Sequence, residues 1–261
     1  MEDILQTIVA HKRREVALHI AHTPLETMRA RAEAVDRPTV SMSWALKTSS
    51  TGIIAEFKRR SPSKGWISRY AHPKDVAAAY ERSGAAAISI LTDGEFFGGG
   101  VSDLTAARAV TTLPLLRKEF IVHEYQIYEA RAVGADAVLL IASVLTPEEC
   151  RHLTDTAHAL GLETLLEIHS TDEIGHILPD TDMIGVNNRH LGSFHTDTEV
   201  SFTMADKLPH DRVLVSESGI SSAETIRRLR EAGFSGFLIG ETFMKCEDPS
   251  QALRQLIAQI Q

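Results

Sequence analysis

The chain has few cysteines and no long apolar run. These two features argue against a disulfide-rich protein and against a membrane-spanning one. Its 261 residues include two cysteines, Cys150 and Cys246, which form no CxxC or other metal-binding spacing, so no disulfide framework is expected. No hydrophobic segment approaches the roughly 18 residues of a membrane-spanning helix. Met1 is followed by Glu2 and Asp3 rather than by a basic segment. The sequence therefore predicts a soluble cytoplasmic protein without a membrane partner.

Basic residues and metal-binding motifs are also scarce. The formal net charge is −8 at pH 7, whereas a general nucleic-acid binder would present a basic face, so no nucleic-acid partner is expected. An anionic small molecule is still compatible with a local site of opposite charge. The twelve histidines form no HExxH or similar pattern, and His190 and His195 are interpreted as loop residues rather than ligands. No metal site is predicted.

The first 50 residues differ in pattern from the rest of the chain. Apolar residues at three- and four-residue spacing predict helix from Glu2 to about Val35, repeating after Pro24. Within it, the basic cluster His11-Lys12-Arg13-Arg14 is interpreted as a solvated helix face. From Gly52 onward, short apolar segments alternate with helical patterns. The eight predicted strands are 53–58, 86–91, 115–118, 137–141, 164–168, 183–187, 213–216 and 237–239.

Repeated strand–helix units predict parallel strands joined by right-handed crossovers. Helix starts are marked by Thr146 before Pro147 and by Ser222 before an acidic first turn. Eight units fit an α/β fold, the (β/α)₈ TIM barrel, here as a single domain with an N-terminal helical extension (1–50) and the barrel in 51–261. An open doubly wound sheet is the alternative. It would carry a G-x-G-x-x-G turn after its first strand, and that turn is missing.

In a closed barrel the carboxyl ends of the strands meet at one mouth, where active sites of this fold lie. Polar side chains end at least five of the predicted strands, among them Glu56 with Lys58, Lys118, Glu167, Asn187 and Glu217. Taken alone, Glu56 and Lys58 could form an ordinary surface ion pair. Convergence of the whole set favours an acid–base site instead, in which Lys118 acts as a general acid or a Schiff-base amine.

Two glycine-containing turns and one aromatic pair complete the predicted mouth. The turns Ser218-Gly219 and Gly240-Glu241 open helices after the last two strands, where barrels commonly bind phosphate. The Glu241 carboxylate would repel a phosphate unless its side chain turns away. Phe96-Phe97, on a loop followed by three glycines, could form one wall of a site for an aromatic substrate.

These motifs together resemble the indole-3-glycerol phosphate synthase family over essentially the whole chain, including the N-terminal extension. The resemblance implies a carboxy-lyase of tryptophan biosynthesis that converts 1-(2-carboxyphenylamino)-1-deoxyribulose 5-phosphate to indole-3-glycerol phosphate, releasing carbon dioxide and water. It implies no cofactor and no metal, and leaves room for association with other enzymes of that pathway. Seven blocks carry it in order: 54–63, 89–92, 116–122, 166–169, 185–189, 216–220 and 237–241.

The resemblance also implies residue roles. Lys118 matches the general acid, Glu167 the second catalytic group, and Lys58 the holder of the substrate carboxylate, although which lysine delivers each proton stays open. The implied catalytic set is Glu56, Lys58, Lys118, Glu167, Asn187, Glu217 and Ser218. The implied substrate-binding set is Ser61, Pro62, Phe97, Phe120, Leu139, Arg189, Leu191, Gly219, Ile239, Gly240 and Glu241, with Lys64 nearby. His190 and Gly98 depart from the Asp and Asn common in the family.

Two other functions remain open at the level of sequence. A phosphoribosylanthranilate isomerase-like barrel would usually place a Cys and an Asp near the first and middle strands, and Glu56 with Lys58 count against it. A barrel that only binds its ligand would leave the charges at the mouth unexplained.

Overall fold

Eight parallel strands close into a barrel in the computed structural model, which describes residues 4–190 and 195–260. Every predicted strand is present, with bounds that differ by at most one residue at either end. The closed sheet confirms the TIM barrel and rules out the open doubly wound alternative. In order around the barrel the strands are β1 (Ile53–Phe57), β4 (Ala87–Leu91), β5 (Leu115–Lys118), β6 (Ala137–Ile141), β7 (Glu163–Ile168), β8 (Met183–Asn187), β9 (Val213–Glu217) and β10 (Gly236–Ile239).

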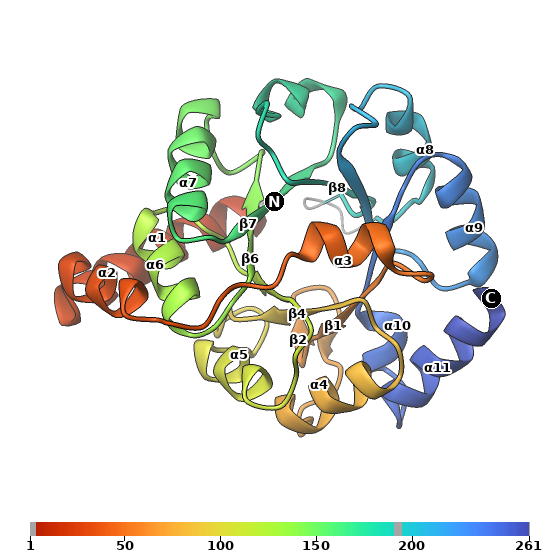
Figure 1. Cartoon of the computed structure of the whole chain (residues 1–261), viewed down its shortest axis with the longest axis horizontal. Helices are drawn as coiled ribbons and strands as arrows, with labels where there is room; N and C mark the ends of the chain where they lie inside the picture. Colours follow the sequence, from red (N-terminus) through yellow and green to blue (C-terminus); the bar gives the residue numbers. More distant parts are fainter. Residues whose placement is uncertain (1–3, 191–194, 261) are drawn as a thin grey trace.

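Helices surround the barrel (Figure 1). The two predicted helix starts are confirmed: Thr146 forms a capping box with Glu149, and Ser222 Oγ accepts the N–H of Thr225 at 3.2 Å. A short hairpin of β2 (Arg60–Ser61) and β3 (Gly65–Trp66) follows β1. The helices are α4 (Pro73–Arg82), α5 (Val101–Arg108), α6 (Glu124–Ala132), α7 (Pro147–Ala159), the 3₁₀ helix η1 (Thr171–His176), α8 (Glu199–Ala205), α9 (Ala223–Glu231), α10 (Glu241–Met244) and α11 (Pro249–Ile260).

Strand alternation sorts side chains into two layers. In β1, Ile53 and Phe57 belong to the cluster beneath the outer helices, whereas Ile54 belongs to the cluster inside the barrel. Glu56 shares the parity of Ile54 and therefore points inward, and Glu167 of β7 does so by the same rule from Leu165. The alternation thus directs the charged strand ends to the barrel axis.

The N-terminal extension contacts both ends of the barrel. It consists of α1 (Ile4–His22), α2 (Leu25–Glu33) and α3 (Met42–Thr48). In Figure 1, α3 lies in front of the barrel, at the N-terminal ends of the strands, and α1 lies behind. Glu163 at the start of β7 fixes α3, because its Oε2 accepts the N–H groups of Met42 and Ser43 at 2.7 and 2.8 Å. Leu5 and Ile8 of α1 join the cluster inside the barrel from the opposite end.

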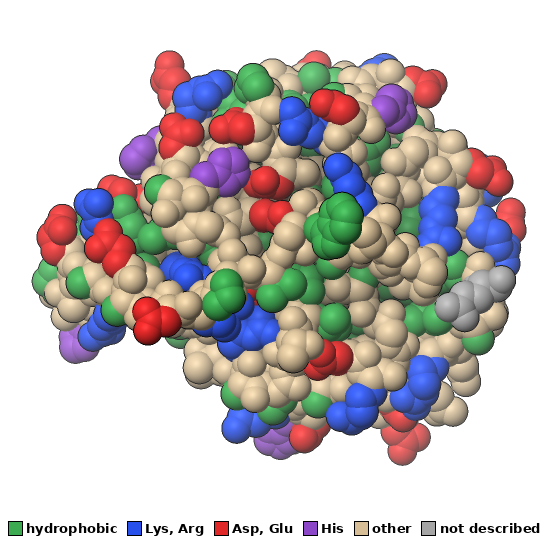
Figure 2. All heavy atoms as spheres, in the orientation of Figure 1, with side chains coloured by type: hydrophobic (Ala, Val, Ile, Leu, Met, Phe, Trp, Pro, Cys, Tyr) green, Lys and Arg blue, Asp and Glu red, His purple; other side chains and the backbone are tan. Residues whose placement is uncertain are grey.

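The face in front carries a mixed surface. Figure 2 shows acidic and basic side chains interspersed over it. Within the described residues, no helix is long and apolar enough to span a membrane.

Candidate active site

A cavity of about 850 Å³ opens at the carboxyl ends of the strands. Every residue of the two predicted site sets lines it, as does Lys64, except Leu191, which lies outside the described residues. The strand-end argument therefore located the mouth correctly. The roles of these residues stay predictions, because geometry alone tests position and not chemistry.

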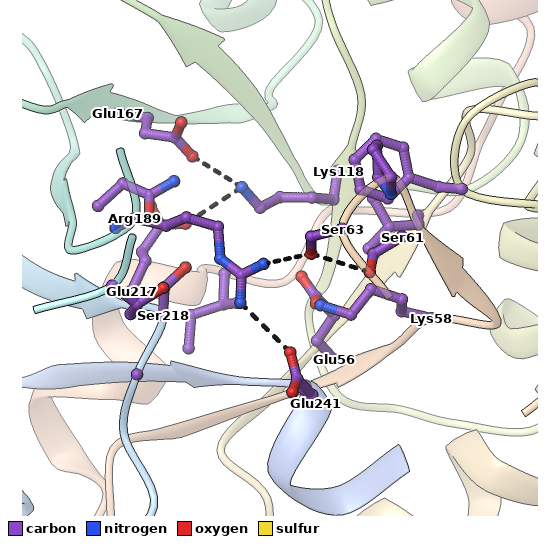
Figure 3. Close-up of a pocket in the computed structure, with 18 of the residues that line it drawn as sticks. Glu56, Lys58, Ser61, Ser63, Lys118, Glu167, Arg189, Glu217, Ser218 and Glu241 are labelled. Carbon is purple, nitrogen blue, oxygen red and sulfur yellow. Dashed lines mark hydrogen bonds and ion pairs between the residues drawn. The ribbon is translucent and has the colours of Figure 1, made fainter. Parts of the chain in front are cut away.

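Two lysine–carboxylate groups face each other across this cavity (Figure 3). Lys118 Nζ lies 2.8 Å from Glu167 Oε2 and 3.1 Å from Glu217 Oε2, while Lys58 Nζ lies 2.7 Å from Glu56 Oε1. Glu56 is only 4% exposed. The alternative of a surface ion pair is therefore wrong for Glu56 and Lys58.

The Lys118 group separates the pKa values of two neighbouring carboxyls. Burial alone would lower the pKa of Lys118, but Glu167, Glu217 and Glu56 raise it above its usual value. Burial would raise the pKa of Glu167, yet Lys118 lowers it on balance to about 2. Burial, opposed by Lys118 and aided by Glu167, raises the pKa of Glu217 to about 7. The protonated Lys118 thus sits between an ionised carboxylate, Glu167, and a carboxyl group, Glu217, that is partly protonated near neutral pH.

Two glycines make room for these carboxylates. A Cβ at Gly185 would overlap Glu217 Oε1, and a Cβ at Gly240 would overlap Glu56 Oε1. Gly240 was predicted as part of a phosphate turn, and Gly185 only as a member of a sequence block. Both fill a role that sequence reasoning missed, because the need for space comes from a neighbouring strand.

The rim near the last strands is suited to phosphate. Ser218 and Gly219 have φ of +67° and +76°, and Asn188 Nδ2 donates to Ser218 O at 3.1 Å. A non-glycine residue in this region is strained, and such strain is concentrated at functional turns. Arg189 Nη2 lies 3.2 Å from Glu241 Oε2, so the Glu241 carboxylate is engaged by a guanidinium rather than left unpaired. Arg189 Nη1 also donates to Ser63 Oγ at 2.9 Å.

An apolar wall lies on another side of the cavity. The Phe97 and Phe120 rings have centroids 5.9 Å apart, and Leu139 lies beside them. Leu5 and Ile8 of α1 complete the wall. Their apolar spacing was visible in the sequence, but the spacing does not say which surface the helix covers.

Lys12 contradicts the expected solvated face of the basic cluster. It is 1% exposed, and its Nζ lies 2.9 Å from Asp93 Oδ2 and 3.1 Å from Glu119 Oε1. Burial would lower the pKa of Lys12, but Glu119 and Asp93 raise it. Asp93 Oδ1 in turn accepts the N–H groups of Phe96 and Phe97 at 2.7 and 3.2 Å. Lys12 therefore ties α1 to the aromatic loop and to the residue after Lys118.

In the described ranges 4–190 and 195–260, no three His, Cys, Asp or Glu side chains are grouped so that they could hold a metal ion. His195 lines the cavity with its neighbour Thr196. Lys245 of the segment after α10 also lines it and was not predicted.

Comparison with known proteins agrees with the motifs. Residues 5–256 match the family model described as Indole-3-glycerol phosphate synthase. A protein of that name from Bacteroides thetaiotaomicron is 53% identical over 261 residues and covers the whole of both chains. Another, from Burkholderia cenocepacia, is 44% identical over 259 residues, covering 98% of this chain and 99% of its own.

More distant solved structures share the fold alone. An N-acetylmannosamine-6-phosphate 2-epimerase from Clostridium perfringens superposes with a TM-score of 0.60 at 14% identity, covering 87% of this chain and 100% of its own. A mutant tryptophan synthase α-subunit from Pyrococcus furiosus reaches 0.59 at 14% identity, covering 80% and 97%. The close relatives and the family model decide the identity: the chain belongs to the indole-3-glycerol phosphate synthase family, the carboxy-lyases that form indole-3-glycerol phosphate in tryptophan biosynthesis.

Proposed function

We propose that this cavity performs the family reaction with Lys118 as the general acid and Glu167 as its partner base. The observation that carries the proposal is the position of Lys118 Nζ between Glu167 and Glu217 in a buried site. The raised pKa keeps Lys118 protonated near neutral pH, which suits proton donation and disfavours a Schiff-base amine, because that amine must be neutral to attack.

Ring closure needs one acid. The ring carbon that carries the carboxylate attacks the ribulose carbonyl carbon, and Lys118 donates a proton to the carbonyl oxygen. The bond to carbon dioxide then breaks, and its electrons restore the aromatic ring. This step leaves a hydroxyl on the new five-membered ring.

Dehydration needs an acid and a base. The hydroxyl leaves as water after a lysine ammonium of the cavity, Lys118 or Lys58, donates a second proton to it. Glu167 removes a proton from the adjacent ring carbon to form the indole double bond. Glu167 is suited to the base role because its lowered pKa keeps it ionised. Lys58, on the other side of the mouth, is held by Glu56 and is a further ammonium of the cavity, as are Lys64 and Lys245.

The remaining lining residues are proposed to orient the substrate. Lys58 would bind the substrate carboxylate, with Glu56 holding its ammonium. The apolar wall would take the aromatic ring, and the turn at Ser218 and Gly219 would take the phosphate. The proposed ring contacts are Pro62, Phe97, Phe120, Leu139 and Ile239, and the proposed phosphate contacts are Ser61, Lys64, Arg189, Ser218, Gly219 and Gly240.

An isomerase-like mechanism is poorly supported by this cavity. Among the described lining residues there is no Cys and no Asp, the pair that such a barrel would use. Cys150 lies buried in α7, where burial raises the pKa of its thiol to about 12. A barrel that binds without catalysis would show substrate binding and no product.

Incubation with the carboxyphenylamino substrate, followed by indole fluorescence, tests the proposal directly. We expect product from the wild type and a kcat lowered by about 10²-fold or more in Lys118→Met, the usual scale for a positioned acid. Glu167→Gln should lower kcat with a modest change in KM. Lys207→Met, at an exposed lysine, is the matched control. Wild-type turnover in Lys118→Met would remove Lys118 from the mechanism.

Association with other tryptophan-pathway enzymes and a cytoplasmic location are also part of this proposal. Membership in a biosynthetic family supports both. Cell fractionation and co-elution with the enzymes of the adjacent steps would test them.

A further inference from the structure

His169 and Glu173 lie directly behind Glu167, and the mechanism above does not use them. His169 is the first residue after β7, and its Nε2 lies 3.4 Å from Glu167 Oε1. Its Nδ1 lies 3.6 Å from Glu173 Oε2, and its backbone N–H donates to the same oxygen at 2.6 Å. Since Glu167 Oε2 is held by Lys118, the carboxylate bridges an ammonium on one side and an imidazole on the other.

This row of groups leads from the interior to solvent. The Glu167 side chain is 2% exposed, whereas His169 and Glu173 are 16% and 17% exposed. The hydrogen bond from the backbone N–H of His169 anchors the Glu173 carboxylate. The Nδ1 atom of His176, also in η1, lies 3.2 Å from the backbone oxygen of Glu173. Water can therefore reach the Glu173 carboxylate at the outer end of the row, whereas both ring nitrogens of His169 and the Glu167 carboxylate are buried.

The groups that face His169 favour its protonated form. Burial alone would lower the pKa of His169, but Glu173 of η1, Glu167 of β7 and Glu217 of β9 raise it. Lys118 lies beyond Glu167 and is the opposing charge. On balance the pKa of His169 is raised, which favours the imidazolium form that donates the proton.

The reaction takes up a proton in each turnover. An ionised substrate carboxylate that leaves as carbon dioxide consumes one proton. In the steps above, lysine ammonium groups donate two protons, one to the carbonyl oxygen and one to the departing hydroxyl. Glu167 takes back only one proton, from the ring carbon. Each turnover must therefore bring one proton from solvent to the Glu167–Lys118 pair.

We propose that His169, anchored by Glu173, carries this proton from solvent to the Glu167–Lys118 pair and holds Glu167 for catalysis. The inference rests on the proposed function. His169 does not touch the reacting atoms, so it is a positioning and relay residue. The proton passes from water to the Glu173 carboxylate and from there to His169 Nδ1, then from Nε2 to Glu167 Oε1, and from Glu167 Oε2 to the amine that Lys118 becomes after donating its proton.

The pH dependence of kcat is the main test. Wild-type kcat should fall as pH rises through the pKa of His169, because the relay needs the protonated ring. Glu173→Gln should move this fall to lower pH, since removing a carboxylate lowers the pKa of His169. His169→Asn should lower kcat by at least about 10-fold with KM changed by less than about 3-fold, because the substrate is bound elsewhere.

Rescue and a matched control separate a relay from a structural role. Added imidazole should restore turnover in His169→Gly and have no effect on the wild type. His152→Asn, at a histidine of α7 that is largely exposed and 3.9 Å from Glu124, should match the wild type. Thermal unfolding of each variant checks that it is folded.

Two results would overturn the relay. One is wild-type kcat and pH profile in His169→Asn. The other is a loss of kcat in His169→Asn that is the same at every pH, together with a failure of added imidazole to restore turnover in His169→Gly. A wild type that forms no indole-3-glycerol phosphate would instead overturn the proposed function.

Discussion

Glu217 occupies an unfavourable position for a carboxylate. It is buried on β9, close to Glu167, and within the described chain neither of its oxygens receives a hydrogen bond of good geometry. The ion pair with Lys118 offsets part of the loss of hydration. Its position therefore serves the site rather than stability.

The raised pKa of Glu217 makes stability depend on pH. The folded-state pKa of about 7 exceeds the unfolded value of roughly 4.3, so the contribution of this group is fully present below the lower value and is lost as pH rises through about 7. Glu217→Gln should therefore raise Tm relative to the wild type more at pH 8 than at pH 6, by about 2–4 °C per kcal/mol relieved, while lowering kcat. Calorimetry at both pH values measures the difference, with exposed Glu231→Gln as control. An equal difference at both would contradict the assignment.

Gly185 can be tested by adding a single methyl group. In Gly185→Ala the new Cβ would overlap Glu217 Oε1 and also lie 3.2 Å from Leu165 Cδ1, so the carboxylate must move away from Lys118. We expect kcat/KM to fall by roughly 10- to 10²-fold, the scale of a displacement near 1 Å. Gly175→Ala, where a Cβ meets nothing within 4 Å, is the control for kinetics and Tm. Full activity in Gly185→Ala would show that Glu217 tolerates displacement.

At the level of elements, α1 behaves as part of the active site. Leu5 and Ile8 cover the apolar wall, and Lys12 fixes the helix through Asp93 and Glu119. The same Asp93 holds the loop that carries Phe97. One ion-pair group therefore sets the position of both the helix and the loop.

Lys12→Met should separate α1 from the mouth. It leaves Asp93 without its cation and Glu119 with only the Arg117 guanidinium, 4.0 Å away. Breaking a buried pair in this way costs about 3–5 kcal/mol. We expect a lower free energy of unfolding in urea, a raised KM, and faster amide hydrogen exchange in α1. Arg13→Met removes an exposed charge from the same helix and should change none of these. Slow exchange in α1 of the Lys12 variant would show that apolar packing alone holds the helix.

At the scale of the whole molecule, a second buried ion-pair cluster lies at the end of the barrel opposite the cavity. At the N-terminal end, fully buried Asp136 Oδ1 pairs with Arg37 at 2.8 Å, and Oδ2 with Arg108 at 2.8 Å and the N–H of Leu115 at 2.8 Å. These contacts join the extension, α5 and the start of β5. The cavity lies at the other end.

Asp136→Asn should therefore lower stability without changing the chemistry. Loss of both ion pairs, with the arginines partly solvated, is expected to lower the free energy of unfolding by about 2–3 kcal/mol. The kcat of the folded fraction should stay within twofold of the wild type. Urea unfolding and turnover at low temperature measure the two quantities, and a marked fall in kcat would show that the two ends are coupled.

Local patterns explain how much was predictable. Buried apolar runs with helix caps between them located all eight strands, and parallel strands necessarily end at the same mouth, so Lys118 and Glu167 were placed together. The positions of Lys12, Gly185 and Glu241 were not predictable in this way. Each depends on a partner far along the chain, and neighbouring residues of identical charge, such as Lys12 and Arg13, differ in burial because of what the helix covers.

The sequence by itself determined the barrel, its mouth and the set of ionisable groups there, because strand period, capping and crossover handedness act over short stretches of chain. Only the tertiary structure decided which groups pair: Lys118 with Glu167 and Glu217, Lys12 with Asp93 and Glu119, and His169 between two carboxylates. Pairing and the resulting pKa shifts depend on distances of a few ångströms and on exclusion of water, and both arise only when the strands close around them.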